Sequence, residues 1–163
     1  DQDLTALFDG FSSSIGGTGQ ELTVDKIFQA VATLRQANVP GPYYGVLNPK
    51  VAYNVKKNLT NTFVNPNPND LTNEALRTGY IGNIAGVQIF ESSNVDGTTD
   101  TDNCKGAIFS QDALGLAMMQ DLKIETQRDA SLRADEIVAT AVFGVGELHD
   151  SYGVELLAES VIN

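Results

Sequence analysis

The sequence predicts an α+β fold in which helices come first and strands last. Two long helical patterns occupy the first third of the chain, and the last third consists of strand patterns separated by short turns. This segregated order is typical of α+β proteins, whereas regular alternation of helices and strands would indicate a parallel sheet. The 163 residues suit one domain, residues 1–163, with a substantial buried core.

The first segment predicts a short helix followed by a connector. Leu4, Leu7, Phe8 and Phe11 recur at helical spacing and form one apolar stripe. The serine- and glycine-rich stretch Ser12–Gly19 indicates a flexible linker. It does not match a phosphate-binding loop, because no Lys-Ser or Lys-Thr pair follows at the required position.

Two longer helices and a strand come next. The first helix is expected over Leu22–Ala37, a short strand over Tyr43–Leu47, and the second helix from Asn48-Pro49 to about Leu59. Asn48 would be its N-cap and Pro49 its first residue. The expected buried positions are Val24, Ile27, Phe28, Val31 and Leu34 in the first helix and Val51, Ala52, Val55 and Leu59 in the second. Lys50, Asn54, Lys57 and Asn58 are expected to face water.

The rest of the chain alternates predicted loops and strands. Loops are expected over residues 61–73 and 92–105, with one glycine-containing strand over residues 79–91 between them. Leu122, Ile124 and Thr126 alternate with polar residues, which predicts a half-buried strand. The stretch Asp135–Val145 is apolar on both faces and predicts a central strand. The strands expected in this last third are Ala107–Phe109, Leu116–Met119, Asp121–Gln127, Asp135–Val145 and Tyr152–Ala158.

Composition narrows the choice of partners. A net charge of -11 makes direct binding of nucleic acid unfavourable, and the adjacent pair Lys56-Lys57 is interpreted as a solvated surface. No run approaches the roughly 18 consecutive apolar residues of a membrane-spanning helix, so no membrane partner is expected. Cys104 is the single cysteine, which excludes an intramolecular disulfide and fits a reducing compartment.

Residues that could carry catalysis or bind metal are few, and the sequence predicts no catalytic, cofactor-binding or metal site. Glu147, His149, Asp150 and Ser151 bring an acid, a base and a hydroxyl close together in sequence. Because a catalytic triad depends on spatial geometry, we interpret this segment as a polar turn between strands.

Two sets of acidic residues also do not match a metal-binding or catalytic site. The loop Asp96–Asn103 is acidic, but it breaks the pattern of a calcium-binding loop at once, because Cys104 and Lys105 occupy ligand and glycine positions. Several further carboxylates have no sequence pattern that places two of them in one cleft, so they are read as surface charge. They are Asp112, Asp121, Glu125, Asp129, Asp135 and Glu136.

The order of these elements resembles the second half of the major capsid protein of tailed bacteriophages, which has the Hong Kong 97-type shell fold. The resemblance is carried by the helix Leu22–Ala37, by residues 43–53 (YYGVLNPKVAY) and 82–93 (GNIAGVQIFESS), and by residues 107–115 (AIFSQDALG). It ends with residues 143–146 (FGVG) and the last strand. No single motif is diagnostic, and the matching order over residues 20–158 carries the resemblance.

The resemblance implies a spine helix over Leu22–Ala37 and two subdomains. The peripheral one would comprise about residues 20–40 and 121–163, and the axial one about residues 41–120. It also implies an N-terminal arm and an extended loop upstream of the spine helix. Neither fits before Leu22, and the chain begins with Asp1 rather than Met, so we expect a fragment that lacks them.

The function that the resemblance implies is structural and not enzymatic. Copies of the chain would form hexamers and pentamers of an icosahedral virion capsid, assembled in the cytoplasm of the bacterial host. Scaffolding, portal and cement proteins are further expected partners, and packaged DNA would be enclosed without specific binding, against an acidic inner surface. Two alternatives stay open: an encapsulin-like nanocompartment shell, and a small acidic hydrolase using His149 with Asp150 or Ser151.

Overall fold

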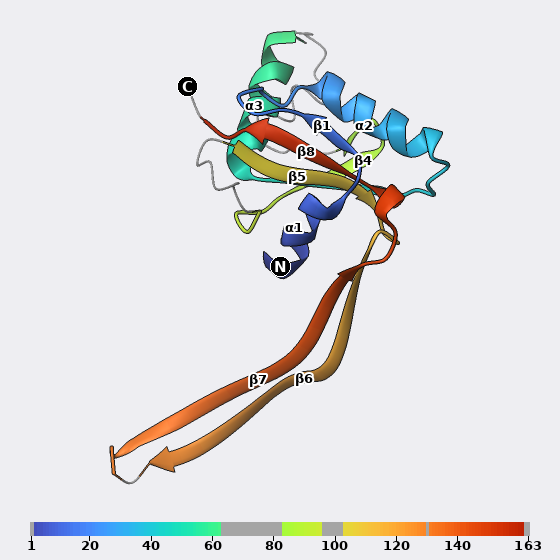
Figure 1. Cartoon of the computed structure of the whole chain (residues 1–163). Helices are drawn as coiled ribbons and strands as arrows, with labels where there is room; N and C mark the ends of the chain where they lie inside the picture. Colours follow the sequence, from blue (N-terminus) through green and yellow to red (C-terminus); the bar gives the residue numbers. More distant parts are fainter. Residues whose placement is uncertain (1, 63–82, 96–102, 130, 162–163) are drawn as a thin grey trace.

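The computed structural model describes residues 2–62, 83–95, 103–129 and 131–161. A compact body built on a six-stranded sheet carries a two-stranded hairpin that projects away from it (Figure 1). We call this hairpin, formed by β6 (Leu114–Asp129) and β7 (Ala134–Glu147), the arm, and the other elements the body. The body contains α1 (Gln2–Ala6), η1 (Leu7–Gly10), β1 (Ser14–Gly16), α2 (Val24–Gln36), β2 (Tyr43–Leu47), α3 (Pro49–Thr62), β3 (Asn83–Ile84), β4 (Val87–Glu91), β5 (Asn103–Ser110), η2 (Asp150–Tyr152) and β8 (Gly153–Glu159).

The sheet of the body is mixed, with the strand order β1-β8-β5-β2-β4-β3. β5 lies near its middle and is antiparallel to both β8 and β2. β1 and β4 are parallel to their neighbours β8 and β2. The arm interrupts the chain between β5 and β8, so these two neighbouring strands are joined through the whole length of the hairpin.

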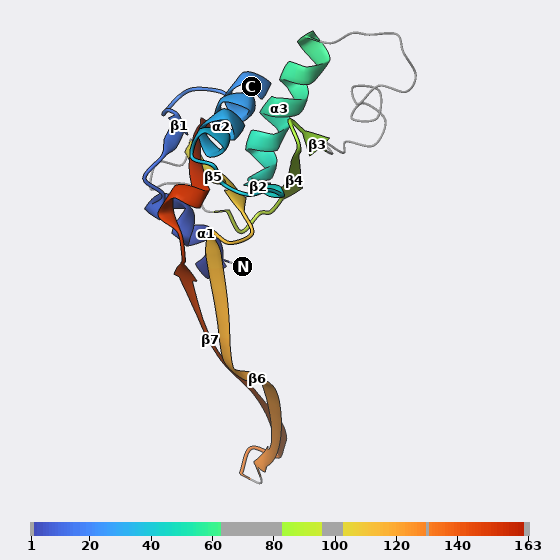
Figure 2. The same ribbon diagram turned by 90° about the vertical axis from the view of Figure 1, so that its right-hand side faces the viewer.

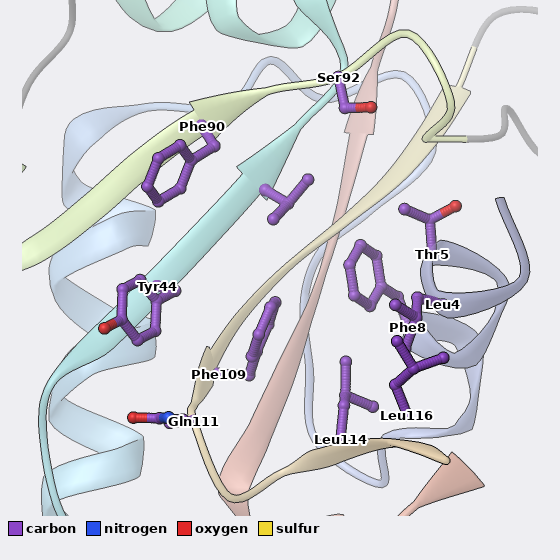
Figure 3. Close-up of a pocket in the computed structure, with 11 residues that line it drawn as sticks. Leu4, Thr5, Phe8, Tyr44, Phe90, Ser92, Phe109, Gln111, Leu114 and Leu116 are labelled. Atoms are coloured by element: carbon purple, nitrogen blue, oxygen red, sulfur yellow. The ribbon is translucent and has the colours of Figure 1, made fainter. Parts of the chain in front are cut away.

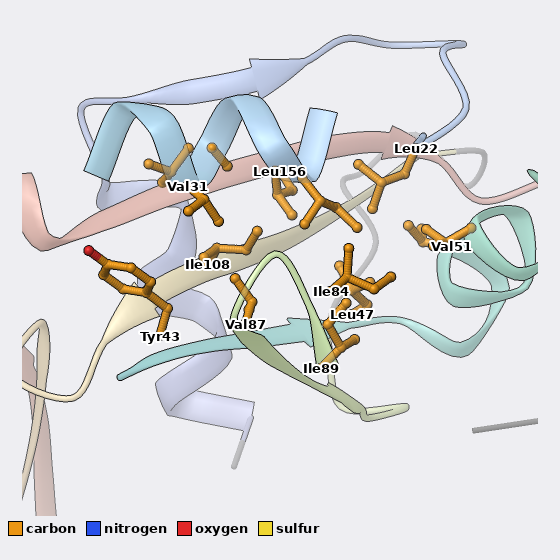
Figure 4. Close-up of a cluster of buried hydrophobic side chains, with 14 of the residues drawn as sticks. Leu22, Val31, Tyr43, Leu47, Val51, Ile84, Val87, Ile89, Ile108 and Leu156 are labelled. Atoms are coloured by element: carbon orange, nitrogen blue, oxygen red, sulfur yellow. The ribbon is translucent and has the colours of Figure 1, made fainter. Parts of the chain in front are cut away.

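Helices α2 and α3 cover one face of the sheet and enclose the main core (Figure 4). Ile27 and Leu34 of α2 are fully buried, as are Val51 and Val55 of α3. Both helices were expected from their apolar periodicity, and both form at the expected places. Identifying α2 as a spine helix stays a prediction, because the structure shows only that α2 packs on the same sheet as α3.

Two helix positions differ from the expectation. Phe28 of α2 is 54% exposed, and Ala30 is buried in its place. Asn54 of α3 is buried, not solvated, and its Nδ2 donates a hydrogen bond to the carbonyl of Glu159 at 3.2 Å. A polar side chain is tolerated in the core when it is hydrogen-bonded, and apolar periodicity does not reveal such a bond.

The start of α3 is as expected. Oδ1 of Asn48 accepts a hydrogen bond from the backbone N–H of Lys50 at 3.0 Å, and Pro49 is the first helical residue. The asparagine satisfies one of the free donors at the helix start, and proline has no N–H to leave unpaired there. The preceding strand, β2, has the predicted bounds Tyr43–Leu47.

The opposite face of the sheet is covered in part by η1 and α1. Phe8 and Phe11 are buried there, and the ring centroids of Phe8 and Phe109 lie 5.6 Å apart. This second cluster ties the beginning of the chain to β5, so the predicted apolar stripe of the first segment is confirmed. On the same segment, Asp9 forms an ion pair with Lys105 of β5.

Two predicted loops were wrong in part. The linker Ser12–Gly19 contains β1, where Gly16 has φ of 106° and an added Cβ would lie 2.1 Å from the carbonyl oxygen of Leu157. The glycine therefore allows β1 to pair closely with β8. In the sequence, the same glycine-rich stretch predicts a flexible linker. The predicted loop over residues 92–105 ends early, because β5 begins at Asn103.

The glycine-containing strand predicted over residues 79–91 is a tight hairpin where it is described. Ala85 and Gly86 both have positive φ and connect β3 to β4, as in a two-residue hairpin turn. Residues 63–82 lie outside the described residues, and with them most of the predicted loop over residues 61–73. The first two residues of that predicted loop belong to α3, which extends to Thr62, past its expected end at about Leu59.

Candidate interaction surface

The arm is long and lies in solvent along most of its length. β6 has 16 residues and β7 has 14, and they pair with each other from Leu114↔Glu147 to Asp129↔Ala134. Turned by 90°, the structure shows the arm leaving the body beside α1 (Figure 2). All residues described at 116–128 and 131–144 are exposed.

This placement corrects two predictions about the last third of the chain. Asp135–Val145, expected to be a central strand, belongs to β7 and is exposed, with Ile137 70% exposed. Asp121–Gln127, expected to be half buried, belongs to β6, where Leu122 and Ile124 are each more than 60% exposed. Apolar periodicity shows which side chains favour burial, but it does not show whether the covering surface comes from the same chain.

The alternation itself is present, and it makes one face of the arm apolar. Directly paired residues point to the same face, and so do residues two apart on a strand. The pairs Met118↔Phe143 and Ile124↔Ala139 therefore share a face. We call this the apolar face of the arm; its large side chains are Leu116, Met118, Leu122 and Ile124 of β6 and Ile137, Phe143 and Val145 of β7.

The other face of the arm is mixed. It carries Lys123 and Glu125, which form an ion pair, and Gln127, together with Val138 and Val142 of β7. Register shifts lie between Met118 and Lys123. Such bulges bend a strand and increase its twist, and the arm bends along its length in both views (Figures 1 and 2).

The apolar face continues into the body through two adjoining grooves. One, of about 430 Å³, is lined by Phe8 of η1, Tyr44 and Phe90 of the sheet, and Leu116 at the root of the arm (Figure 3). The other, of about 200 Å³, lies between Leu4 of α1 and the side chains of Leu116, Met118 and Phe143. Leu4 and Leu116 line both grooves, so the apolar surface runs unbroken from the sheet to the arm.

The segment around His149 forms a turn, as predicted. His149 is exposed, and its ring contacts that of Tyr152 in a tilted arrangement, with 4.7 Å between the ring centroids. Oδ1 of Asp150 accepts a hydrogen bond from the backbone N–H of Ser12 at 2.7 Å. Hydrogen bonds from the side chain and backbone of Ser12 lower the pKa of Asp150 below its usual value of 3.8. The carboxylate thus ties η2 to the segment before β1.

The other charged candidates are spread over the molecule. Lys105 binds Asp9, and its Nζ lies 3.4 Å from Oε1 of the buried Glu155. The hydrogen bond to Asp9 is the main cause that raises the pKa of Lys105, and burial opposes it. Cys104, expected in a polar loop, is buried in β5. The carboxylates at 121, 125, 135 and 136 belong to exposed parts of the arm, and Asp112 is exposed in the turn before it.

Metal and membrane features can be assessed only in the part of the chain that the structure describes. Within it, no cluster of three His, Cys, Asp or Glu residues is placed to hold a metal ion. Residues 96–102 of the acidic loop lie outside that part; Oδ1 of Asn103, at its end, accepts a hydrogen bond from the N–H of Gly19. None of the described helices is long and apolar enough to cross a bilayer.

Comparison with known proteins identifies the fold. A family model described as phage capsid protein matches residues 1–154, and no curated protein matches significantly. The structure of Mycobacterium phage Che8 is similar with a TM-score of 0.77 at 22% identity, over 96% of this chain and 57% of that chain. The capsid structure of the cyanophage P-SCSP1u has a TM-score of 0.71 at 18% identity, over 96% of this chain and 60% of that chain. The holo-SrpI encapsulin complex of Synechococcus elongatus PCC 7942 has a TM-score of 0.63 at 12% identity, over 91% of this chain and 53% of that chain.

The chain thus spans between 53% and 60% of the length of these three structures. Identities this low show the fold alone, and that fold is the Hong Kong 97-type shell fold expected from the order of elements. The family match is independent of the structural likeness and covers nearly the whole chain. By that match, the chain belongs to the phage capsid protein family.

Proposed function

We propose that this chain is the part of a major capsid subunit that forms the shell of a tailed phage. The observation that carries the proposal is the arm, whose apolar face is exposed over most of its length in the single chain. Monomeric proteins rarely expose a continuous apolar surface of this kind, and such surfaces mark contacts with other proteins. A subunit of a closed shell supplies those contacts through its own copies.

Covering this surface favours assembly and offsets part of the cost of association. Six large side chains of the apolar face are each more than half exposed. Complete burial of such a side chain stabilises by about 1.5 to 3 kcal/mol, and somewhat more than half of each side chain is still exposed, so covering all six is worth on the order of 5 to 10 kcal/mol. These residues are Leu116, Met118, Leu122, Ile124, Ile137 and Phe143.

The expected partners follow from the same proposal. Copies of the chain would meet in hexamers and pentamers, with scaffolding, portal and cement proteins as further partners. The net charge of -11 favours enclosing DNA without holding it, provided that acidic side chains line the interior. The shell would be the virion capsid, assembled in the bacterial cytoplasm. The division into a peripheral part (about 20–40 and 121–163) and an axial part (about 41–120) stays a prediction.

An encapsulin-like shell is the second candidate, supported by the likeness to the holo-SrpI encapsulin complex. Because both classes share the fold, the contents of the particle distinguish them. The phage reading is favoured by the family match over residues 1–154. A hydrolase is disfavoured, since Asp150 accepts a hydrogen bond from Ser12 and the ring of His149 contacts that of Tyr152 in an exposed turn.

Electron microscopy of the protein expressed from its complete coding sequence tests the proposal. We expect closed, uniform shells from the purified protein, alone or with co-expressed scaffold. Nucleic acid within shells recovered from phage-infected cells would support the capsid reading, and a packaged enzyme in their place would support the encapsulin alternative. A protein that stays monomeric at high concentration, with and without scaffold, would contradict both.

A further inference from the structure

A shallow groove on the other side of the body is separate from the arm. It runs between α2 and the turn that joins β3 to β4. Its lining residues are Phe28, Val31, Ala32 and Arg35 of α2, and Ala85 and Gly86 of the turn.

The groove has an apolar floor with one prominent aromatic side chain. Phe28 belongs to the apolar stripe predicted for α2, yet it is 54% exposed, whereas Ile27 and Val31 are buried in the core. In the isolated chain, about half of this large apolar side chain stays in contact with water. Covering it would bury a large apolar surface of the kind that dominates protein interfaces.

Arg35 supplies a positive charge at the edge of the groove. It is exposed, and its guanidinium lies along the hairpin turn, since a Cβ added to Gly86 would be 3.9 Å from Nη2. Arg35 has no ion pair in the described part of the chain, unlike several lysines of the body. The lysine pairs are Lys56–Glu91, Lys57–Glu21 and Lys105–Asp9.

Charge complementarity indicates what occupies the groove. With a net charge of -11, copies of this chain repel one another unless acidic groups of one copy meet basic groups of the next. The chain has 21 acidic residues against 10 basic ones, so acidic segments are the more abundant partners for Arg35. We propose that the groove receives an acidic segment of a neighbouring copy, with a carboxylate on Arg35 and an apolar side chain on Phe28. This inference rests on the proposed shell function.

The contact would be heterologous, because the groove and the acidic segment are different surfaces of the same chain. Repeated heterologous contacts close into rings when the rotation between copies allows it. The arm and the groove would then contribute different contacts to the assembly.

The test compares four proteins expressed from the complete coding sequence: the unchanged protein, Arg35→Glu, Phe28→Ser and the control Lys50→Glu. Lys50 is an exposed lysine of α3 outside the groove, so its reversal changes the net charge equally. Sedimentation measures the concentration at which half of the protein is assembled, and thermal unfolding checks the fold. We expect Arg35→Glu to raise this concentration about tenfold or more, as for a charge reversal in an interface, with Phe28→Ser similar and the control within about twofold.

A cross-linking measurement identifies the contact directly. In the variant Arg35→Lys, a zero-length carbodiimide reagent can join the new amine to a carboxylate within contact distance. Mixing isotope-labelled and unlabelled protein separates links between copies from links within one copy. We expect a link from position 35 to an acidic residue of another copy.

The outcomes separate the inference from the function on which it rests. If the unchanged protein forms shells and Arg35→Glu assembles at the same concentration, the inference is overturned and the shell function stands. The inference is overturned in that case even if the groove binds some other protein. If the unchanged protein forms no shells, the proposed function itself fails. Equal weakening by Lys50→Glu would assign the effect to net charge and also overturn the inference.

Discussion

Replacing Ile137 by serine tests whether the apolar face of the arm is an assembly contact. Ile137 is 70% exposed in the single chain, so the change removes little packing within it. In an assembly that covers the apolar face, the same side chain would be buried. Burial of an isoleucine is worth about 1.5 to 3 kcal/mol, and roughly 70% of that, about 1 to 2 kcal/mol, is available at this position. Since 1.4 kcal/mol corresponds to tenfold in affinity, Ile137→Ser should weaken each contact about 5- to 30-fold.

Val138 supplies the matched control, because it is the next residue of β7 and points to the other face of the arm. Val138→Ser should weaken assembly less than Ile137→Ser, as measured by light scattering against protein concentration. Both variants should keep the unfolding midpoint of the body, measured by circular dichroism. Equal effects of the two variants on assembly would refute the assignment of the contact to one face. A large fall in the unfolding midpoint with Ile137→Ser would show that the side chain is buried within the chain.

Three further predictions concern the body. Ile27→Ala removes a fully buried side chain of the core and should lower the free energy of unfolding by about 2 to 5 kcal/mol, measured with urea. Gly153→Ala should also destabilise, by about 1 to 3 kcal/mol, because the added Cβ would lie 2.2 Å from Cζ of Phe11, and Phe11→Leu should relieve part of the loss. Asp150 has a lowered pKa in the fold, so its stabilisation is present above pH 3.8 and is lost as the pH falls through the folded pKa. Asp150→Asn should flatten that acid limb of the stability curve, and an unchanged acid limb would contradict the prediction.

Local sequence signals predicted helices α2 and α3 and strand β2 well. The bounds of β2 and the proline start of α3 follow from signals that act over a few residues, namely an N-cap asparagine and a first-turn proline. β1 was missed because its pairing with β8 links residues near the two ends of the chain. The buried Asn54 was missed for the same reason, since its partner is the carbonyl of Glu159, far away in sequence.

The candidate surface was visible in sequence, but its location was not. The alternation of Leu122, Ile124 and Thr126 predicted a strand with one apolar face, and β6 has one. The same pattern predicts burial within the chain, because a sequence does not distinguish a covering surface of the same chain from one of another molecule. The groove at α2 is similar: Phe28 fits the apolar stripe, and only the structure shows that its side chain is more than half exposed.

The shape of the arm strengthens the argument that its partner is a protein surface. A two-stranded hairpin is marginally stable alone in water, and both of its outer edges leave backbone N–H and C=O groups unpaired. The arm nevertheless keeps paired strands from Leu114 to Asp129 and a nearly continuous series of apolar side chains on one face. Strand pairing and an apolar face of this length add little stability to the arm unless another protein surface covers the apolar face. Because the apolar face continues into the groove beside α1, one covering surface could reach both the arm and the body. A shell in which each copy contacts its neighbours supplies such a surface to every copy.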